Sequence, residues 1–509
     1  MSRPNVLVVV LDATRADHLS CYGHDRPTTP TVDRLAASGV RYTSAFSNSN
    51  WTGTSHGALF TGQLPSHSGV YAGQQTLPAD VETLPERLQA AGYDTFGMSA
   101  GTHLRGSRGY DRGFDVFKET YRVSPSLDFL RKAVSDPPLR AQTLFSATRG
   151  PDDKTLYKFR SLRRWIRRVD GPFFGFINAK TAHHPYNPPR PYKSMFCPDL
   201  RRARYQFVEE LFGDEFGERQ TIPGEDYRRL QRLSYQYPVI AGEIPADTPG
   251  WETIRAWYDG AVRYVDDRLG ELVDELDRLG ELEHTYVFVT ADHGEYFGEH
   301  GLEKHYYSLY EPVLHVPLVV HTPDGVGAGD EDSGRDDGTG GADGAAPGSV
   351  HDDRGQEAAV TVDEPVSLVD LYPTIVELAG ESVDREHAAS LVPVGDGPGH
   401  DHVFAELGEV GPEGITGHHP GFDDSGYGDP VQVVRDDEYK LLVEDGEAEL
   451  YEWRADPAES TDRADDRPAV RDRLADVVDA ELGELTHSAL SEDIEDSDLQ
   501  DHLEELGYM

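Results

Sequence analysis

Five short runs of apolar residues recur along the first two thirds of the chain. They cover residues 6–11, 93–99, 173–178, 286–291 and 316–321, and they are rich in valine, isoleucine and phenylalanine. Runs of this length and composition are typical of buried β-strands. The pattern therefore predicts a sheet whose strands are covered on both faces.

Helical patterns lie between these runs. Residues 154–169 and 254–279 place apolar side chains three or four positions apart, the spacing of an amphipathic helix. Strands that alternate with helices indicate an α/β fold with a central, mostly parallel sheet flanked by helices. We assign residues 1–324 to this core.

The pattern changes after residue 324. Residues 325–358 are mostly Gly, Asp, Ala and Ser, too few apolar side chains to offset the entropy of folding, so we expect a disordered acidic insertion. Residues 359–485 contain the remainder of the core and a small carboxyl-terminal α+β subdomain, with helices at 367–380 and 468–485 and an antiparallel pair at 431–434 and 439–443. An acidic tail, 486–509, ends the chain.

Acidic residues outnumber basic residues by 92 to 47, which gives a formal net charge of −45. Acids spread over the whole sequence indicate a halophile-like surface, whose self-repulsion is screened at high salt. Nucleic acids and anionic membranes are excluded as partners by this charge.

Targeting signals are not evident in the sequence. The apolar run at 6–11 is too short for the core of a signal peptide, and no stretch approaches the roughly 20 apolar residues of a membrane span. The two cysteines, Cys21 and Cys197, suggest neither a disulfide framework nor a zinc-thiolate site. We expect a cytoplasmic protein.

Candidate metal ligands follow two of the predicted strands. Asp12 comes directly after the first run, and Asp292 and His293 come directly after the fourth. Parallel α/β sheets carry their chemistry at the carboxyl ends of the strands, so these side chains are expected to converge on a metal ion. The alternative is structural: Asp12 caps a helix and His293 is a hydrogen-bonded turn residue.

A third candidate segment, Trp51 to Gly62, contains hydroxyls and glycines and leads into a short apolar helix. The start of a helix offers unpaired N–H groups to an anion. Beside a metal ion, Thr52 becomes a candidate nucleophile, because the cation acidifies its hydroxyl. The alternative interpretation is a simple helix cap.

In these segments the chain resembles the sulfatase family, within the alkaline phosphatase superfamily. The resemblance rests on Asp12 after Pro4-Asn5-Val6, the Thr52 segment, His183-His184-Pro185-Tyr186, Asp292-His293-Gly294-Glu295 and Lys304-His305, which occur in the order and spacing of that family. It implies an alkaline-phosphatase-like α/β sandwich.

The resemblance also implies roles for individual residues. Asp12, Asp292 and His293 would bind a divalent cation together with Thr52, which falls at the position of the nucleophile. His183 matches a residue that contacts the substrate, with a solvated loop histidine as the alternative. Lys304 matches a lysine that bridges the anion.

Several positions depart from the family pattern. The family signature is Cys or Ser, any residue, Pro, Ser, Arg, whereas this chain has Thr52-Gly53-Thr54-Ser55-His56. Threonine would not give the formylglycine that sulfatases make from Cys or Ser, so no formylglycine is expected. The arginine that contacts the anion is replaced by His56, and the second residue of the usual Asp-Asp pair is Ala13.

The chain also departs from related proteins at a second substrate-binding segment and at the ligands of a second metal. A lysine of the family is lost at Gly101, whereas His103 keeps the neighbouring histidine. His56 and His103 are the candidate substrate-binding residues, with a helix-start or loop histidine as the alternative for His103. No Asp-x-x-x-His sequence precedes Asp292 that would supply a second metal. We therefore expect one divalent ion (calcium, manganese or magnesium), with Asp259, Asp266 and Asp267 as helix-surface or second-layer carboxylates.

These observations predict a metal-dependent hydrolase of a small anionic phosphate or sulfate ester, possibly on a glycan, that acts through a covalent Thr52 intermediate. Two alternatives stay open. One is a phosphotransferase that acts on a glycan or lipid head group, and the other is a catalytically silent glycan-binding relative. The sequence does not decide the oligomeric state.

Overall fold

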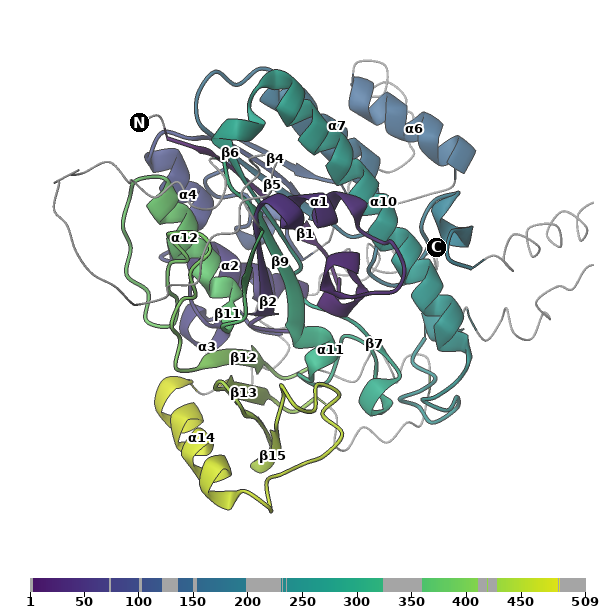
Figure 1. Ribbon diagram of the computed structural model, residues 1–509, viewed down its shortest axis with the longest axis vertical. Helices are drawn as coiled ribbons and strands as arrows, with labels where there is room; N and C mark the ends of the chain where they lie inside the picture. The colour runs from purple at the N-terminus through teal and green to yellow at the C-terminus, as the bar shows by residue number, and fades with distance from the viewer. Residues whose placement is uncertain are drawn as a thin grey trace, which may run out of the picture.

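A nine-stranded sheet forms the centre of the computed structural model (Figure 1). The structure describes residues 3–72, 75–99, 103–120, 136–149, 153–197, 230, 232–234, 236–323, 359–410, 419, 428–483 and 485. The predicted insertion at 325–358 and the predicted tail at 486–509 lie outside these residues, and so does Gly101.

All five predicted strands are confirmed, to within one or two residues at their ends. They are β1 (Asn5–Leu11), β3 (Asp94–Ser99), β5 (Phe173–Ala179), β6 (Thr285–Thr290) and β9 (His315–His321). The strand order is β10-β2-β9-β6-β1-β5-β3-β4, with β11 also paired to β2. Strand β1 is therefore central, with β5 and β6 parallel to it on either side.

The sheet is mostly parallel, as predicted, with one exception. Strand β9 runs antiparallel to both of its neighbours, β6 and β2 (Val40–Phe46). The other edges are formed by β4 (Val116–Glu119), β10 (Val360–Val362) and β11 (Val366–Ser367), all paired in parallel.

Helices cover the sheet in two groups (Figure 1). One group contains α1 (Pro30–Ser38), α7 (Thr155–Ile166) and the long α10 (Gly250–Leu279), with α6 (Pro137–Arg149) packed on α7. The other contains α2 (Thr52–Thr61), α4 (Leu84–Ala90) and α12 (Leu371–Leu378). The predicted helices at 154–169, 254–279 and 367–380 are therefore present.

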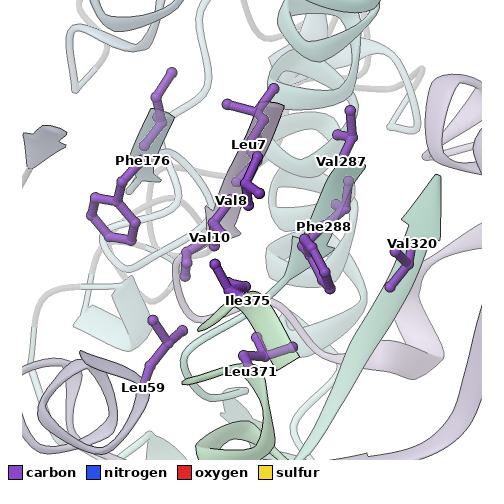
Figure 2. Close-up of a cluster of buried hydrophobic side chains, with 14 of the residues drawn as sticks. Leu7, Val8, Val10, Leu59, Phe176, Val287, Phe288, Val320, Leu371 and Ile375 are labelled. Atoms are coloured by element: carbon purple, nitrogen blue, oxygen red, sulfur yellow. The ribbon is translucent and has the colours of Figure 1, made fainter. Parts of the chain in front are cut away.

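The second group of helices buries apolar side chains against the central strands. Leu59 of α2 and Leu371 and Ile375 of α12 point toward side chains of β1, β6 and β9 (Figure 2). All three are at most 1% exposed. This packing fixes the position of α2, whose first residue is Thr52.

The carboxyl-terminal subdomain is a separate antiparallel sheet in the order β12 (Val403–Leu407), β13 (Val431–Arg435), β14 (Lys440–Glu444), β15 (Glu447–Tyr451). Helix α14 (Pro468–Glu481) packs on it and ends four residues before the predicted end. Glu311, in the short α11 (Glu311–Leu314), binds Arg435 and Lys440 and so links this sheet to the core.

Short elements complete the described part of the chain. They are α3 (Pro65–Ser68) and an antiparallel pair, β7 (Tyr296–Phe297) and β8 (Glu303–Lys304). Among the described residues, no helix has both the length and the apolar character needed to cross a membrane.

Candidate active site at the carboxyl edge of the sheet

The three predicted metal ligands meet at one edge of the sheet. Strands β1 and β6 are paired in parallel up to Val10 and Thr290, so the segments that follow them emerge side by side. Potential ligand atoms of Asp12, Asp292 and His293 lie within 4.8 Å of one another, and all three residues are buried.

In Asp12 and in Asp292, only one of the two carboxylate oxygens accepts hydrogen bonds. Asp292 Oδ1 accepts hydrogen bonds from the backbone N–H groups of Ala13 and His293, both at 3.0 Å, and Asp12 Oδ2 accepts one from Asn178 Nδ2 at 2.9 Å. The other oxygens, Asp12 Oδ1 and Asp292 Oδ2, are buried without a hydrogen-bond partner in the described structure. Burial of such groups is unfavourable unless a cation compensates for the lost solvation.

The protonation states of Asp12 and His293 are also compatible with a bound cation. Burial, with the nearby charge of Asp292, raises the pKa of Asp12 to about 6. His293 Nδ1 lies 2.8 Å from the carbonyl of Gly294 and donates to it, so Nε2 carries the lone pair. Two carboxylate oxygens and one imidazole nitrogen suit a hard or borderline divalent ion such as calcium, manganese or magnesium.

Ala13, which stands where the family keeps a second aspartate, contributes its backbone. It adopts the left-handed conformation with a φ of 57°, which directs its N–H toward Asp292. Its carbonyl accepts a hydrogen bond from the Tyr258 hydroxyl at 2.7 Å. The loop after β1 is thus fixed from both sides.

Thr52 is the first residue of α2 and faces this site. Its Oγ1 lies 3.3 Å from His293 Nε2, and the residue is 7% exposed. The hydroxyl of Ser55, one turn further along α2, donates to the backbone carbonyl of Asp292 at 2.7 Å. The start of the helix is therefore bonded to the loop that carries the metal ligands.

His56 lies behind Thr52. It is fully buried, and its Nδ1 is 2.8 Å from the carbonyl of Thr52, whereas Nε2 is 3.4 Å from Asn178 Nδ2. Burial lowers its pKa to about 4, so the ring is neutral at pH 7. It offers no positive charge in place of the family arginine, and no exposed edge for a substrate.

The structure places the other predicted substrate residues at different distances from the site. The His183 ring centroid is 4.9 Å from that of His305, which is itself 4.3 Å from that of His293. His103 Nδ1 lies 2.6 Å from Gln75 Oε1, and its ring centroid lies 5.9 Å from that of Trp51 in an edge-to-face arrangement.

Lys304 points toward the ring of Tyr237. Its Nζ lies 3.5 Å from the centroid of the Tyr237 ring, and its charged neighbours are Glu303 and Glu295. Burial lowers its pKa to about 8, against the attraction of these two carboxylates. The next residue, His305, takes the place beside His293.

Sequence analysis missed three residues of the site: Asn178, Lys180 and His305. Asn178 belongs to the end of β5, and Lys180 follows that strand directly. The charge of Lys180 acts on both Asp12 and His183. The same rule that identified Asp12 applies to this strand, because β5 is the other neighbour of β1.

The helix-surface position expected for Asp259 and Asp266 is wrong, because both side chains are buried, at 0% and 2% exposed. The Asp259 carboxylate on α10 binds His18 Nδ1 at 2.6 Å, His24 Nε2 at 3.1 Å and Arg26 Nη1 at 2.6 Å. A helical pattern does not reveal this burial, because the partners of Asp259 come from the loop after β1.

Fold and site together define an α/β enzyme of the alkaline phosphatase superfamily. The profile of the sulfatase family matches residues 4–381, and the chain belongs to the sulfatase family, as its motifs predicted. Membership makes it a hydrolase of sulfuric or phosphoric ester bonds.

Known proteins are similar over most of the chain. An N-acetylglucosamine-6-O-sulfatase from Bacteroides thetaiotaomicron is 23% identical, over 90% of this chain and 82% of the relative. A multifunctional alkaline phosphatase superfamily protein, PehA, from Trinickia caryophylli is 24% identical, over 59% of this chain and 65% of the relative. The crystal structure of a phosphonate monoester hydrolase from Agrobacterium radiobacter has a TM-score of 0.65 and 24% identity, covering 94% of this chain and 95% of the other.

Proposed function

We propose that the protein cleaves a phosphate or sulfate ester by nucleophilic attack of Thr52, with a divalent ion held by Asp12, Asp292 and His293. One observation carries this proposal. The Thr52 hydroxyl lies 3.3 Å from His293 Nε2, beside two buried carboxylate oxygens that have no hydrogen-bond partner in the described structure.

The bound ion would supply Lewis acidity, which lowers the pKa of a nearby hydroxyl and attracts the anionic ester. In the first step Thr52 Oγ1 forms a bond to the phosphorus or sulfur atom, the bond to the ester oxygen breaks, and the alcohol leaves. Water then attacks the same atom, releases the anion and restores Thr52. A threonine side chain supports this two-step route directly, without conversion to formylglycine.

The start of α2 supports the same role for Thr52. The first N–H groups of a helix have no partner within the helix and carry partial positive charge, so they favour the oxygens of a bound anion. Gly53 follows Thr52, and the Gln75 side chain lies where a side chain at this position would stand, with Oε1 2.6 Å from the place of a Cβ.

Phosphoryl transfer suits an alkoxide nucleophile better than sulfate transfer, and we place a phosphate or phosphonate monoester first and a sulfate ester second. The substrate is a small anionic ester, and a glycan carrier is suggested by the N-acetylglucosamine-6-O-sulfatase among the relatives. The net charge of −45 supports a requirement for high salt. We also propose a cytoplasmic location.

The test is an assay of aryl phosphates, phosphonate monoesters, phosphate diesters and aryl sulfates in molar salt, with added manganese, magnesium or calcium. Thr52→Ala is expected to abolish turnover, and Thr61→Ala, at the other end of the same helix, is expected to retain it. Rapid acid quenching followed by peptide mass spectrometry is expected to locate the transferred group on Thr52. Full activity of Thr52→Ala contradicts covalent catalysis, and capture of the group by an added alcohol would indicate a transferase.

A further inference from the structure

Three further imidazoles gather beside the Asp12, Asp292 and His293 site. The rings of His183 and His184 have centroids 4.1 Å apart, and the ring of His305 lies 4.9 Å and 5.6 Å from them. One potential ligand nitrogen of each ring lies within 4.8 Å of the other two. His184 and His305 are buried, whereas His183 is partly exposed.

Two of these rings are oriented as metal ligands usually are. His183 Nδ1 lies 2.7 Å from the carbonyl oxygen of His184, and His305 Nδ1 lies 3.2 Å from Glu295 Oε1. His183 Nδ1 must donate to this carbonyl, which leaves its Nε2 with the lone pair. A carbonyl or carboxyl group bonded to Nδ1 is the usual second layer around a metal-bound histidine. The expected ligand His293 has the same arrangement with the carbonyl of Gly294.

We propose that His183, His184 and His305 bind a second metal ion, next to the one expected at Asp12, Asp292 and His293. Three neutral nitrogen ligands favour an ion such as zinc, cobalt or nickel over magnesium or calcium. This second ion revises the expectation of a single metal. Its role, which is to hold an oxygen of the anionic ester, rests on the proposed function.

A second ion adds positive charge for an anionic substrate. A divalent ion at the first site is neutralised by the carboxylates of Asp12 and Asp292. Lys304 faces Glu303 and Glu295, and Lys180 adds one positive charge beside Asp12 and His183. A divalent ion on three neutral imidazoles retains its full charge, and such a charge in a buried site binds an anion strongly.

The two ligand sets are close enough to act on one substrate. The His305 ring centroid lies 4.3 Å from that of His293, so one histidine of each set lies next to the other. Two-metal hydrolases place their ions roughly 3.5–4 Å apart, where the ions bind different oxygens of the same ester group.

The experiment uses the full chain with the first site disabled by Asp12→Asn and Asp292→Asn together. After removal of metals by a chelator, cobalt(II) is added and its visible absorption bands are recorded in molar salt. We expect one equivalent with bands of a nitrogen-rich site. Adding His305→Phe should remove this equivalent, whereas adding His321→Phe, a control in strand β9, should leave it in place.

Failure to bind cobalt, or cobalt bands that His305→Phe does not change, would overturn the second site. Because the phenylalanine variants could unfold, circular dichroism is recorded for each. Copper(II) electron paramagnetic resonance of the Asp12→Asn, Asp292→Asn protein counts the bound imidazole nitrogens without removing any histidine. We expect three, and a spectrum with none overturns the proposal.

The second site and the proposed function fail in different ways. If the wild type hydrolyses an ester with one bound ion and His305→Phe leaves turnover and metal content unchanged, the second site is wrong and the function stands. If the cobalt and copper results are as expected but no phosphate, phosphonate or sulfate ester is cleaved, the site stands and the function is wrong.

Discussion

Asn178 tests how the site is held together, because it supports a predicted metal ligand without being one. Its Nδ2 donates to Asp12 Oδ2 at 2.9 Å, and the residue is fully buried. Asn178→Ala removes this hydrogen bond and leaves a second oxygen of Asp12 without a donor. A hydrogen bond to a charged group contributes roughly 1.5–3 kcal/mol, which corresponds to about a 10- to 100-fold loss of metal affinity.

The assay is isothermal titration of manganese into chelator-treated protein in molar salt. The matched control is Asn5→Ala, at the opposite end of the central sheet. Asn5 is also buried, and its Nδ2 donates to a carboxylate, Glu281 Oε2, at 3.0 Å. Both variants are expected to lose thermal stability, but only Asn178→Ala should bind manganese more weakly. Equal manganese affinity in a folded Asn178→Ala protein and in the wild type would refute the argument.

Three other substitutions or conditions test the rest of the account. Burial acts to raise the pKa of Glu311, but Arg435 and Lys440 lower it to about 2. The ionised Glu311 side chain therefore stabilises the fold fully above the unfolded pKa of about 4.3, and this stabilisation is lost as the pH falls toward 2. The difference in unfolding free energy between wild type and Glu311→Gln should reach roughly 3 kcal/mol near pH 6 and shrink below pH 4, and a difference independent of pH contradicts this. Leu59→Ala should cost about 2–5 kcal/mol in denaturant unfolding, since Leu59 is 1% exposed, and a cost near zero would mean that α2 is not anchored there. Raising salt from low to molar concentration should increase the melting temperature, because the net charge is −45, and a salt-independent melting temperature argues against a halophile-like surface.

The central strands could be predicted because they are buried on both faces. Continuous apolar runs mark β1, β5, β6 and β9, a more polar run marks β3, and each strand was located to within one or two residues. Strand β2 was missed, because Arg41 and Thr43 alternate with buried Val40 and Tyr42 and interrupt the run. The direction of β9 also could not be read from its composition, since an apolar run looks the same in a parallel and an antiparallel strand.

The convergence of Asp12, Asp292 and His293 could be predicted from strand ends and from the family resemblance together. The contribution of Asn178 required the strand order, which places β5 beside β1. His305, one residue after Lys304, is the residue that lies beside His293. Lys304 has a φ of 62°, and this left-handed conformation in β8 turns its side chain toward Tyr237. No pattern in the sequence indicates such a backbone conformation.

The most direct test of the central claim is anomalous diffraction from crystals of the full chain grown with manganese. The account predicts an anomalous peak within coordination distance of Asp12 Oδ1, Asp292 Oδ2 and His293 Nε2, with the Thr52 hydroxyl directed at it. Manganese bound elsewhere in the crystal with no peak among these three residues, or a peak from which Thr52 is turned away, would contradict the account.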